Sequence, residues 1–135
     1  MSTLVVIAEH DQSVRDCMVD ALEYNGYRVA AFEEAAEATP FMKSHADSVG
    51  LVIVGSQARK HLSRIELLRA SKSDYHLPVV VGPEALAKQS ADLSLADAVL
   101  PAQWHLDDLL RVCRTVLRKD EKVSAFLASE RKRLS

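Results

Sequence analysis

Short apolar segments with the length of β-strands occur at regular intervals along the chain. There are five, at residues 4–8, 28–32, 51–54, 77–81 and 98–100. Most are rich in β-branched residues and run without polar interruption, which is typical of strands buried on both faces of a parallel sheet. The strongest lies in the middle of the chain, where Leu51-Val52-Ile53-Val54 is followed by Gly55-Ser56-Gln57.

Segments with helical periodicity separate the apolar ones. The clearest has apolar residues at i, i+3, i+4, i+7 and i+8, namely Val14, Cys17, Met18, Ala21 and Leu22. Asp11 or Ser13 is expected to cap its start, and Asn25-Gly26 its end. Further helices are predicted at residues 33–44, 64–71, 84–90 and from 106 onward, with a polar loop at 56–63. Pro40 lies inside the second helix and should kink or shorten it.

Strand and helix alternate five times, which predicts the α/β class and a doubly wound parallel sheet. The five-stranded, flavodoxin-like version has the strand order 2-1-3-4-5, with its switch point between strands 1 and 3. Ligands and chemistry lie just beyond the carboxyl ends of such strands. We therefore expect Glu9 and His10, which follow the first strand, to lie beside Gly55 at the mouth of the sheet.

Composition narrows the class of protein. The 135 residues suffice for one domain with a core, and 48% hydrophobic with 27% charged residues indicates a globular chain. A net charge of −2 gives no excess for binding nucleic acid, and no apolar run is long enough to span a membrane. The start lacks the basic region of a signal peptide. Cys17 and Cys113 are expected to be reduced core thiols of a cytoplasmic protein.

Several segments, in this order and spacing, resemble the receiver domain of two-component response regulators. They are Leu4-Val5-Val6-Ile7-Ala8-Glu9-His10-Asp11-Gln12-Ser13-Val14-Arg15, Ala21-Leu22-Glu23-Tyr24-Asn25-Gly26-Tyr27-Arg28-Val29, Leu77-Pro78-Val79-Val80-Val81, Leu95-Ala96-Asp97-Ala98-Val99-Leu100-Pro101 and Leu106-Asp107-Asp108-Leu109-Leu110. The resemblance covers residues 3–118. It implies a domain in which an aspartate after strand 3 accepts a phosphoryl group, helped by acidic Mg²⁺ ligands, a hydroxyl residue and a lysine.

The positions that match these functional residues carry side chains that cannot perform the corresponding roles. The acceptor position is Gly55, which has no nucleophile, and the acidic pair falls on Glu9 and His10. A neutral imidazole is a poor ligand for Mg²⁺. The hydroxyl position falls on Pro83, or on Gly82 if the strand is one residue shorter, and the lysine position on Ala102. The resemblance is therefore to a degenerate receiver, or pseudo-receiver, whose phosphorylation site is lost.

This interpretation predicts a non-enzymatic regulatory module of a phosphorelay pathway, with neither cofactor nor metal. Its expected partner is a signalling protein or an output domain, and not nucleic acid or a membrane. The resemblance places the interaction face at the helix expected over residues 84–90 and at the last strand and helix, around Val99, Trp104 and Leu106. A homodimer through this face is a further option. Two alternatives stay open: a working receiver with rearranged chemistry, and a small-molecule sensor that binds at the vacated site between Gly55, Gly82 and Ala102.

Other residues near the expected site offer weaker hypotheses. Ser56 is a hydroxyl beside the acceptor position but lacks an evident base. Glu9, His10 and Asp11 could form a transition-metal site, although three adjacent residues do not easily converge on one ion. Arg59 and Lys60 could fold back onto Glu9 and neutralise it, in place of forming a solvated loop.

The C-terminal segment continues a helical pattern past the expected domain end. A 4-3-4-3 spacing links Leu109, Cys113, Val116, Asp120, Val123, Leu127, Glu130 and Leu134. Residues 119–135 are thus expected to be a helical extension, or a linker to an output domain, rather than a solvated tail.

Overall fold

The structure is a computed structural model that describes residues 3–55, 61–82, 95–101 and 103–118. These ranges contain a five-stranded parallel sheet with the order β2-β1-β3-β4-β5. The strands are β1 (Leu4–Ala8), β2 (Arg28–Phe32), β3 (Val49–Val54), β4 (Val79–Val81) and β5 (Ala98–Val99). The predicted fold class and strand order are confirmed.

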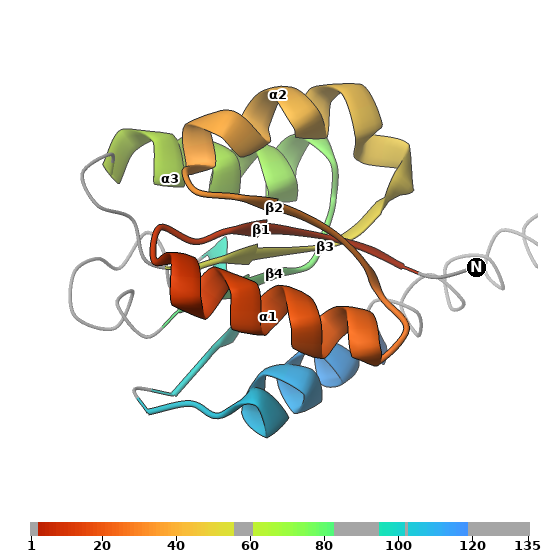
Figure 1. Ribbon diagram of the computed structural model, residues 1–135. Helices are drawn as coiled ribbons and strands as arrows, with labels where there is room; N and C mark the ends of the chain where they lie inside the picture. The colour runs from red at the N-terminus through yellow and green to blue at the C-terminus, as the bar shows by residue number, and fades with distance from the viewer. Residues whose placement is uncertain (1–2, 56–60, 83–94, 102, 119–135) are drawn as a thin grey trace, which may run out of the picture.

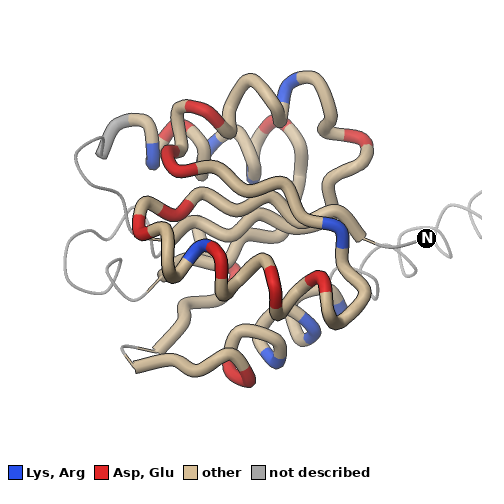
Figure 2. Tube along the Cα trace, viewed as in Figure 1, with Lys and Arg blue, Asp and Glu red and all other residues tan. Residues whose placement is uncertain are grey.

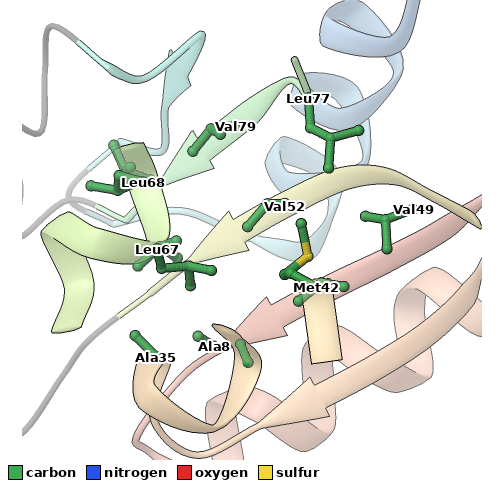
Figure 3. Packing of buried hydrophobic residues seen from close by; sticks show 13 residues of the cluster. Ala8, Ala35, Met42, Val49, Val52, Leu67, Leu68, Leu77 and Val79 are labelled. Carbon is green, nitrogen blue, oxygen red and sulfur yellow. The ribbon is translucent and has the colours of Figure 1, made fainter. Parts of the chain in front are cut away.

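Helices cover both faces of the sheet. One face carries α1 (Gln12–Tyr24) and a helix over residues 106–118, and the other carries α2 (Ala35–His45) and α3 (His61–Arg69) (Figure 1). Successive strand residues point to opposite faces, so each buried strand contributes to two separate cores. The cores contain Val5, Ile7, Leu51 and Ile53 on the α1 side, and Val6, Ala8, Val52 and Val54 on the α2 side. Figure 3 shows the latter, with Met42 and Leu67 from the two helices packed near Val52.

The caps of α1 follow the sequence prediction. The Asp11 carboxylate accepts a hydrogen bond from the Val14 amide at 3.1 Å, and therefore satisfies a donor that has no partner within the helix. The helix ends at Asn25, and Gly26 has a φ of 91°. This left-handed conformation suits a residue without a Cβ atom.

Pro40 does not shorten α2, although shortening was one of the two effects expected of a proline inside this helix. Glu34 and Glu37 form a capping box at the N-terminus, and the helix continues through Pro40 to His45. A proline inside a helix removes one backbone donor. Buried contacts of Ala38 and Met42, on either side of Pro40 in sequence, hold this segment against the sheet.

The prediction of a polar loop at residues 56–63 is wrong at its C-terminal end, because α3 already begins at His61. This helix passes into a π-helical turn, Ala70–Asp74. The turn is tied to the sheet through Asp97, whose Oδ2 atom accepts hydrogen bonds from Lys72 Nζ at 2.6 Å and from the Val79 amide at 2.7 Å. One carboxylate thus joins the starts of β4 and β5 to the turn.

The two cysteines have different environments, which corrects the prediction that both are core thiols. Cys113 is buried, and burial raises the pKa of its thiol from the ordinary value of 9.0 to about 12. Cys17 is exposed, because on α1 it lies beside the buried Met18 but faces an open cavity at the edge of the core. The helical periodicity therefore predicted a buried position for a residue that lies at the edge of the buried face of α1.

Two predicted segments lie outside the described residues: the helix at 84–90 and the extension at 119–135. The proposed boundaries of the receiver-like domain and of the extension consequently stay predictions. Within the ranges that are described, no helix combines the length and apolarity needed to cross a membrane.

Candidate functional site

The carboxyl ends of three strands bring Glu9, Gly55 and Gly82 together. The Gly55 amide donates to the Ala8 carbonyl at 2.8 Å, and the Gly82 amide donates to the Val54 carbonyl at 2.9 Å. These bonds continue the parallel ladders one residue beyond the strands. The predicted juxtaposition of Glu9 with Gly55 is therefore present in the structure.

Glu9 fills the space above Gly55. A Cβ atom built on Gly55 would collide with Glu9 Oε1 and would lie 3.0 Å from Glu9 Cδ. The Glu9 side chain is only 4% exposed, and its Oε2 atom accepts a hydrogen bond from the Asp11 amide at 2.9 Å. The carboxylate is thus held over the position at which a side chain of residue 55 would begin.

A buried arginine contacts the same glycine from another element. Arg64 on α3 is 4% exposed, and its Nη1 atom donates a hydrogen bond to the Gly55 carbonyl. Sequence reasoning did not assign Arg64 to the site. The signal was present, however, because Arg64 lies three and four residues before the buried Leu67 and Leu68, on the inner face of the helix.

His10 does not join Glu9 over the glycine. Its ring lies near Glu33, with 3.6 Å between His10 Nδ1 and Glu33 Oε1, and its side chain is 43% exposed. No set of three His, Cys, Asp or Glu side chains converges as a metal site within the described ranges. The hypothesis of a metal bound by Glu9, His10 and Asp11 therefore receives no support from this geometry.

The remaining residues of the expected site are distributed differently. Pro83, Ala102, Ser56, Arg59 and Lys60 lie outside the described residues. Gly82, the alternative to Pro83, is buried beside Gly55, with 3.4 Å between a Cβ atom built on it and the Gly55 Cα.

The three residues expected on the interaction face do not share one environment. Val99 packs against the core on the α2 side of the sheet, whereas Trp104 packs against the core on the α1 side. Leu106 is 41% exposed at the start of the helix over residues 106–118. Trp104 and Leu106 therefore lie near one another and line the same cavity, while Val99 packs on the other face of the sheet.

A cavity of about 630 Å³ opens at this end of the sheet, between α1 and the segment that precedes the helix over residues 106–118. The three strand-end residues Glu9, Gly55 and Gly82 belong to its lining. Its other lining residues are Asp11, Ser13, Val14, Cys17, Met18, Leu100, Gln103, Trp104, His105 and Leu106. Sequence reasoning anticipated space at the glycines but not the contribution of α1.

Comparison with known proteins identifies relatives over most of the chain. No protein-family model matches it. The response regulator MprA of Mycobacterium bovis (strain BCG / Pasteur 1173P2) is 25% identical over 126 residues, and that of Mycobacterium ulcerans (strain Agy99) is 26% identical over 120 residues. These matches cover 93% and 88% of this chain but only 55% and 52% of the relatives. The chain thus spans about half the length of the curated relatives it matches.

Solved structures share the fold at lower sequence identity. A response regulator receiver domain protein from Clostridium thermocellum has a TM-score of 0.76 at 20% identity, and covers 91% of this chain and 99% of its own. The signal receiver domain of a putative Luxo repressor protein from Vibrio parahaemolyticus has a TM-score of 0.76 at 14% identity, over 93% of this chain and 98% of its own. The fold described above is therefore that of receiver domains.

Proposed function

Because this chain is a relative of the response regulators and has the receiver fold, we propose that it is a regulatory module of signal transduction that works without aspartyl phosphorylation. The observation that carries this proposal is the position of Glu9 over Gly55. The proposed module is not an enzyme, and its output is contact with another protein.

The chemistry of phosphoryl transfer explains why this observation matters. An acceptor must bring a nucleophilic oxygen in line with the leaving group, and a metal or cations must neutralise the developing charge. Gly55 provides no oxygen from a side chain, and the Glu9 carboxylate occupies the space from which one would approach. His10, the second position of the acidic pair, directs its ring towards Glu33.

Glu9 and Arg64 together support a fixed arrangement at the strand ends. A carboxylate lies against the Cα of Gly55, and a guanidinium binds the carbonyl of the same residue. Two buried charged groups of opposite sign thus contact the same residue, Gly55. We infer that this end of the sheet is held in one state, and that regulation comes from a partner rather than from a phosphoryl group.

The proposed partner surface is the edge formed by Trp104 and Leu106. Leu106 is among the few large apolar side chains that the described part of the chain exposes, and the half-buried Trp104 lies two residues before it. Aromatic and apolar anchors of this kind are common at the centres of protein interfaces. A signalling protein, an output domain or a second copy of this chain fits such a surface.

Beryllofluoride with Mg²⁺, a mimic of the phosphoryl group, tests the proposal directly. Its addition is expected to leave the amide NMR spectrum unchanged, and incubation with acetyl phosphate is expected to leave the intact mass unchanged. Site-specific shifts near Glu9 and Gly55, or a mass increase of one phosphoryl group, would instead support a receiver with rearranged chemistry. An active receiver domain treated in parallel shows that the reagents work.

A further inference from the structure

One edge of the sheet is formed by β2, which has β1 as its only neighbour among the described strands and lies between α1 and α2 (Figure 1). The hydrogen bonds at its two ends fix its orientation. The Arg28 amide and the Phe32 carbonyl both bond to residues 3–9, the segment around β1, at 2.9 Å each. Successive residues of a strand in a parallel ladder direct their backbone groups to opposite sides. Val29 and Ala31 therefore present their N–H and C=O groups on the side away from β1.

The edge formed by β2 lacks the usual features that prevent strand addition. Edge strands are commonly protected by charged side chains, prolines, bulges or shortness. Residues 29–32 are Val-Ala-Ala-Phe, and the ladder between β2 and β1 keeps one register over five residues. The opposite edge is β5, which spans two residues and is soon followed by Pro101. Of the two edges, β2 is thus the one at which another strand fits.

The distribution of charge along β2 indicates which strand fits there. Arg28 at its start and Glu33 just after its end are both exposed, and Figure 2 shows the uncharged part of the strand between a basic start and an acidic end. A second β2 in the antiparallel direction brings the basic start of each copy near the acidic end of the other, whereas a parallel one places like charges together. Two identical edges related by a two-fold axis also form a closed pair rather than a fibre.

We propose that two copies of this chain associate through their β2 strands, antiparallel to one another, so that two five-stranded sheets become one continuous sheet. The register follows from the outward backbone groups: Val29 of each copy pairs with Ala31 of the other, and both pairs exchange N–H···O=C hydrogen bonds. Ala30 then lies at the two-fold axis, opposite Ala30 of the second copy. This inference goes beyond the proposed function, because the surface of Trp104 and Leu106 follows β5 at the opposite edge and stays accessible.

Apolar groups on both faces of β2 would be covered by this association. On the α1 side, the half-buried Val19 and Val29 pack against the core of that face. On the α2 side, the half-buried rings of Phe32 and Phe41 lie with 5.4 Å between their centroids. In the proposed register, Arg28 of one copy stands opposite Phe32 of the other on the α2 side, where a guanidinium can contact an aromatic ring.

Cysteine crosslinking tests the register. A residue between two hydrogen-bonded antiparallel pairs has about 4.5 Å between its Cα atom and the opposite one, which suits a disulfide. In a Cys17→Ser background, in which the remaining Cys113 is buried, Ala30→Cys is therefore expected to form a disulfide-linked dimer under mild oxidation. Ala31→Cys is the matched control, because Ala31 is more exposed but stands diagonal to its own copy. It should crosslink at least about tenfold more slowly.

Sedimentation of the full chain over a range of concentrations measures the association without an added cysteine. Ala31→Lys places a charge at an exposed edge position, and the lysines of the two copies would be diagonal neighbours. The dissociation constant of the dimer should therefore rise at least about tenfold. Ser73→Lys is the control, because it adds the same charge at an exposed position in the π-helical turn that precedes β4. It should leave the dissociation constant unchanged.

Amide hydrogen exchange reports on the seam itself. A higher protein concentration should slow exchange of the Val29 and Ala31 amides and leave that of Ala30, which bonds towards β1, unchanged. The proposal is overturned if the chain stays monomeric at millimolar concentration, if the dimer persists unchanged in Ala31→Lys, or if Ala31→Cys crosslinks as fast as Ala30→Cys. Addition of a strand from another protein to a chain that stays monomeric likewise overturns it. Beryllofluoride sensitivity would contradict only the proposed function.

Discussion

The Glu9 carboxylate lies over the α-carbon of Gly55, so closely that the glycine has no room for a side chain. Glu9 follows β1 and Gly55 follows β3, and the two strands are neighbours in the sheet. The identity of each residue thus limits the other. Substitutions at Glu9, Gly55 and the neighbouring Arg64 therefore test it directly.

Gly55→Ala should destabilise the protein, because the added methyl group meets Glu9 Oε1 and must displace a buried carboxylate. Overpacking of this kind is expected to lower the free energy of unfolding by about 1–3 kcal/mol. Urea denaturation followed by circular dichroism measures the change. Gly82→Ala is the control: its new Cβ atom would lie 3.4 Å from the nearest heavy atom, an ordinary contact. Equal losses in both variants would show that the collision with Glu9 is not the cause.

A double-mutant cycle isolates the contact between the two residues. Glu9→Ala alone removes the hydrogen bond to the Asp11 amide and is expected to cost stability. In the Gly55→Ala background it also removes the collision, so the combined loss should be smaller than the sum of the two single losses. A coupling energy of about 0.5–3 kcal/mol is expected for residues in contact. Strict additivity would contradict the geometry.

Arg64→Met should lower the free energy of unfolding by about 1–3 kcal/mol, because the Gly55 carbonyl loses a donor in a buried place. Methionine keeps much of the apolar stem, so the change tests mainly the hydrogen bond. Arg69→Met, an exposed position on the same helix, is expected to change stability by less than about 0.5 kcal/mol. Thermal and chemical denaturation of both variants provide the comparison. A loss at Arg69 as large as that at Arg64 would argue against a specific role.

The two partners of the Asp97 carboxylate should contribute unequally. Lys72→Ala breaks a partly exposed ion pair and is expected to cost about 0–1 kcal/mol. Asp97→Ala also removes the acceptor of the Val79 amide and should cost more, by about 1 kcal/mol. Hydrogen exchange of the Val79 amide should accelerate in Asp97→Ala but not in Lys72→Ala. Acceleration in both variants would indicate that the ion pair itself holds β4.

The two thiols should differ in reactivity. A thiol reagent at mildly alkaline pH is expected to modify one cysteine in the native protein and two after unfolding, because Cys17 is exposed and burial raises the pKa of Cys113 to about 12. Mass spectrometry of digested fragments identifies the modified residue. Cys17→Ser should abolish modification of the native state, and rapid labelling of that variant would contradict the burial of Cys113.

The same pKa shift gives a pH dependence with a definite sign. In the unfolded chain the Cys113 thiol ionises at its ordinary pKa of 9.0, whereas in the folded chain it stays protonated to about 12. The unfolded state therefore binds fewer protons between these values, and the free energy of unfolding falls as the pH rises through this window. Cys113→Ala should show a weaker loss of stability at alkaline pH than the parent protein.

Much of the fold was predictable because it depends on patterns that extend over several residues. The apolar segments around Val6, Ile53 and Val80 are long enough to identify buried strands, and their alternation with helices sets the strand order. Cys17 was misplaced because periodicity does not reveal where a helix passes the edge of the core. The same limit applies to α3, whose first turn carries polar residues that resemble a loop.

The site was predictable in its position but not in its contacts. Topology alone places Glu9 beside Gly55, because the carboxyl ends of neighbouring parallel strands meet. The direction of the Glu9 side chain, the inward turn of Arg64 and the outward turn of His10 depend on rotamers and on local hydrogen bonds. No spacing rule encodes these choices.

The shortness of β5 limits how anything can attach at that edge of the sheet. Within the described part of the chain β5 consists of Ala98 and Val99, which pair with β4, and Pro101 follows soon after them. A longer free strand edge presents a row of unpaired backbone donors and acceptors, to which a strand from another chain can add. Two residues offer too short a row for that mode. A partner that binds at this edge would therefore have to be recognised through the shape and chemistry of side chains rather than through backbone hydrogen bonds.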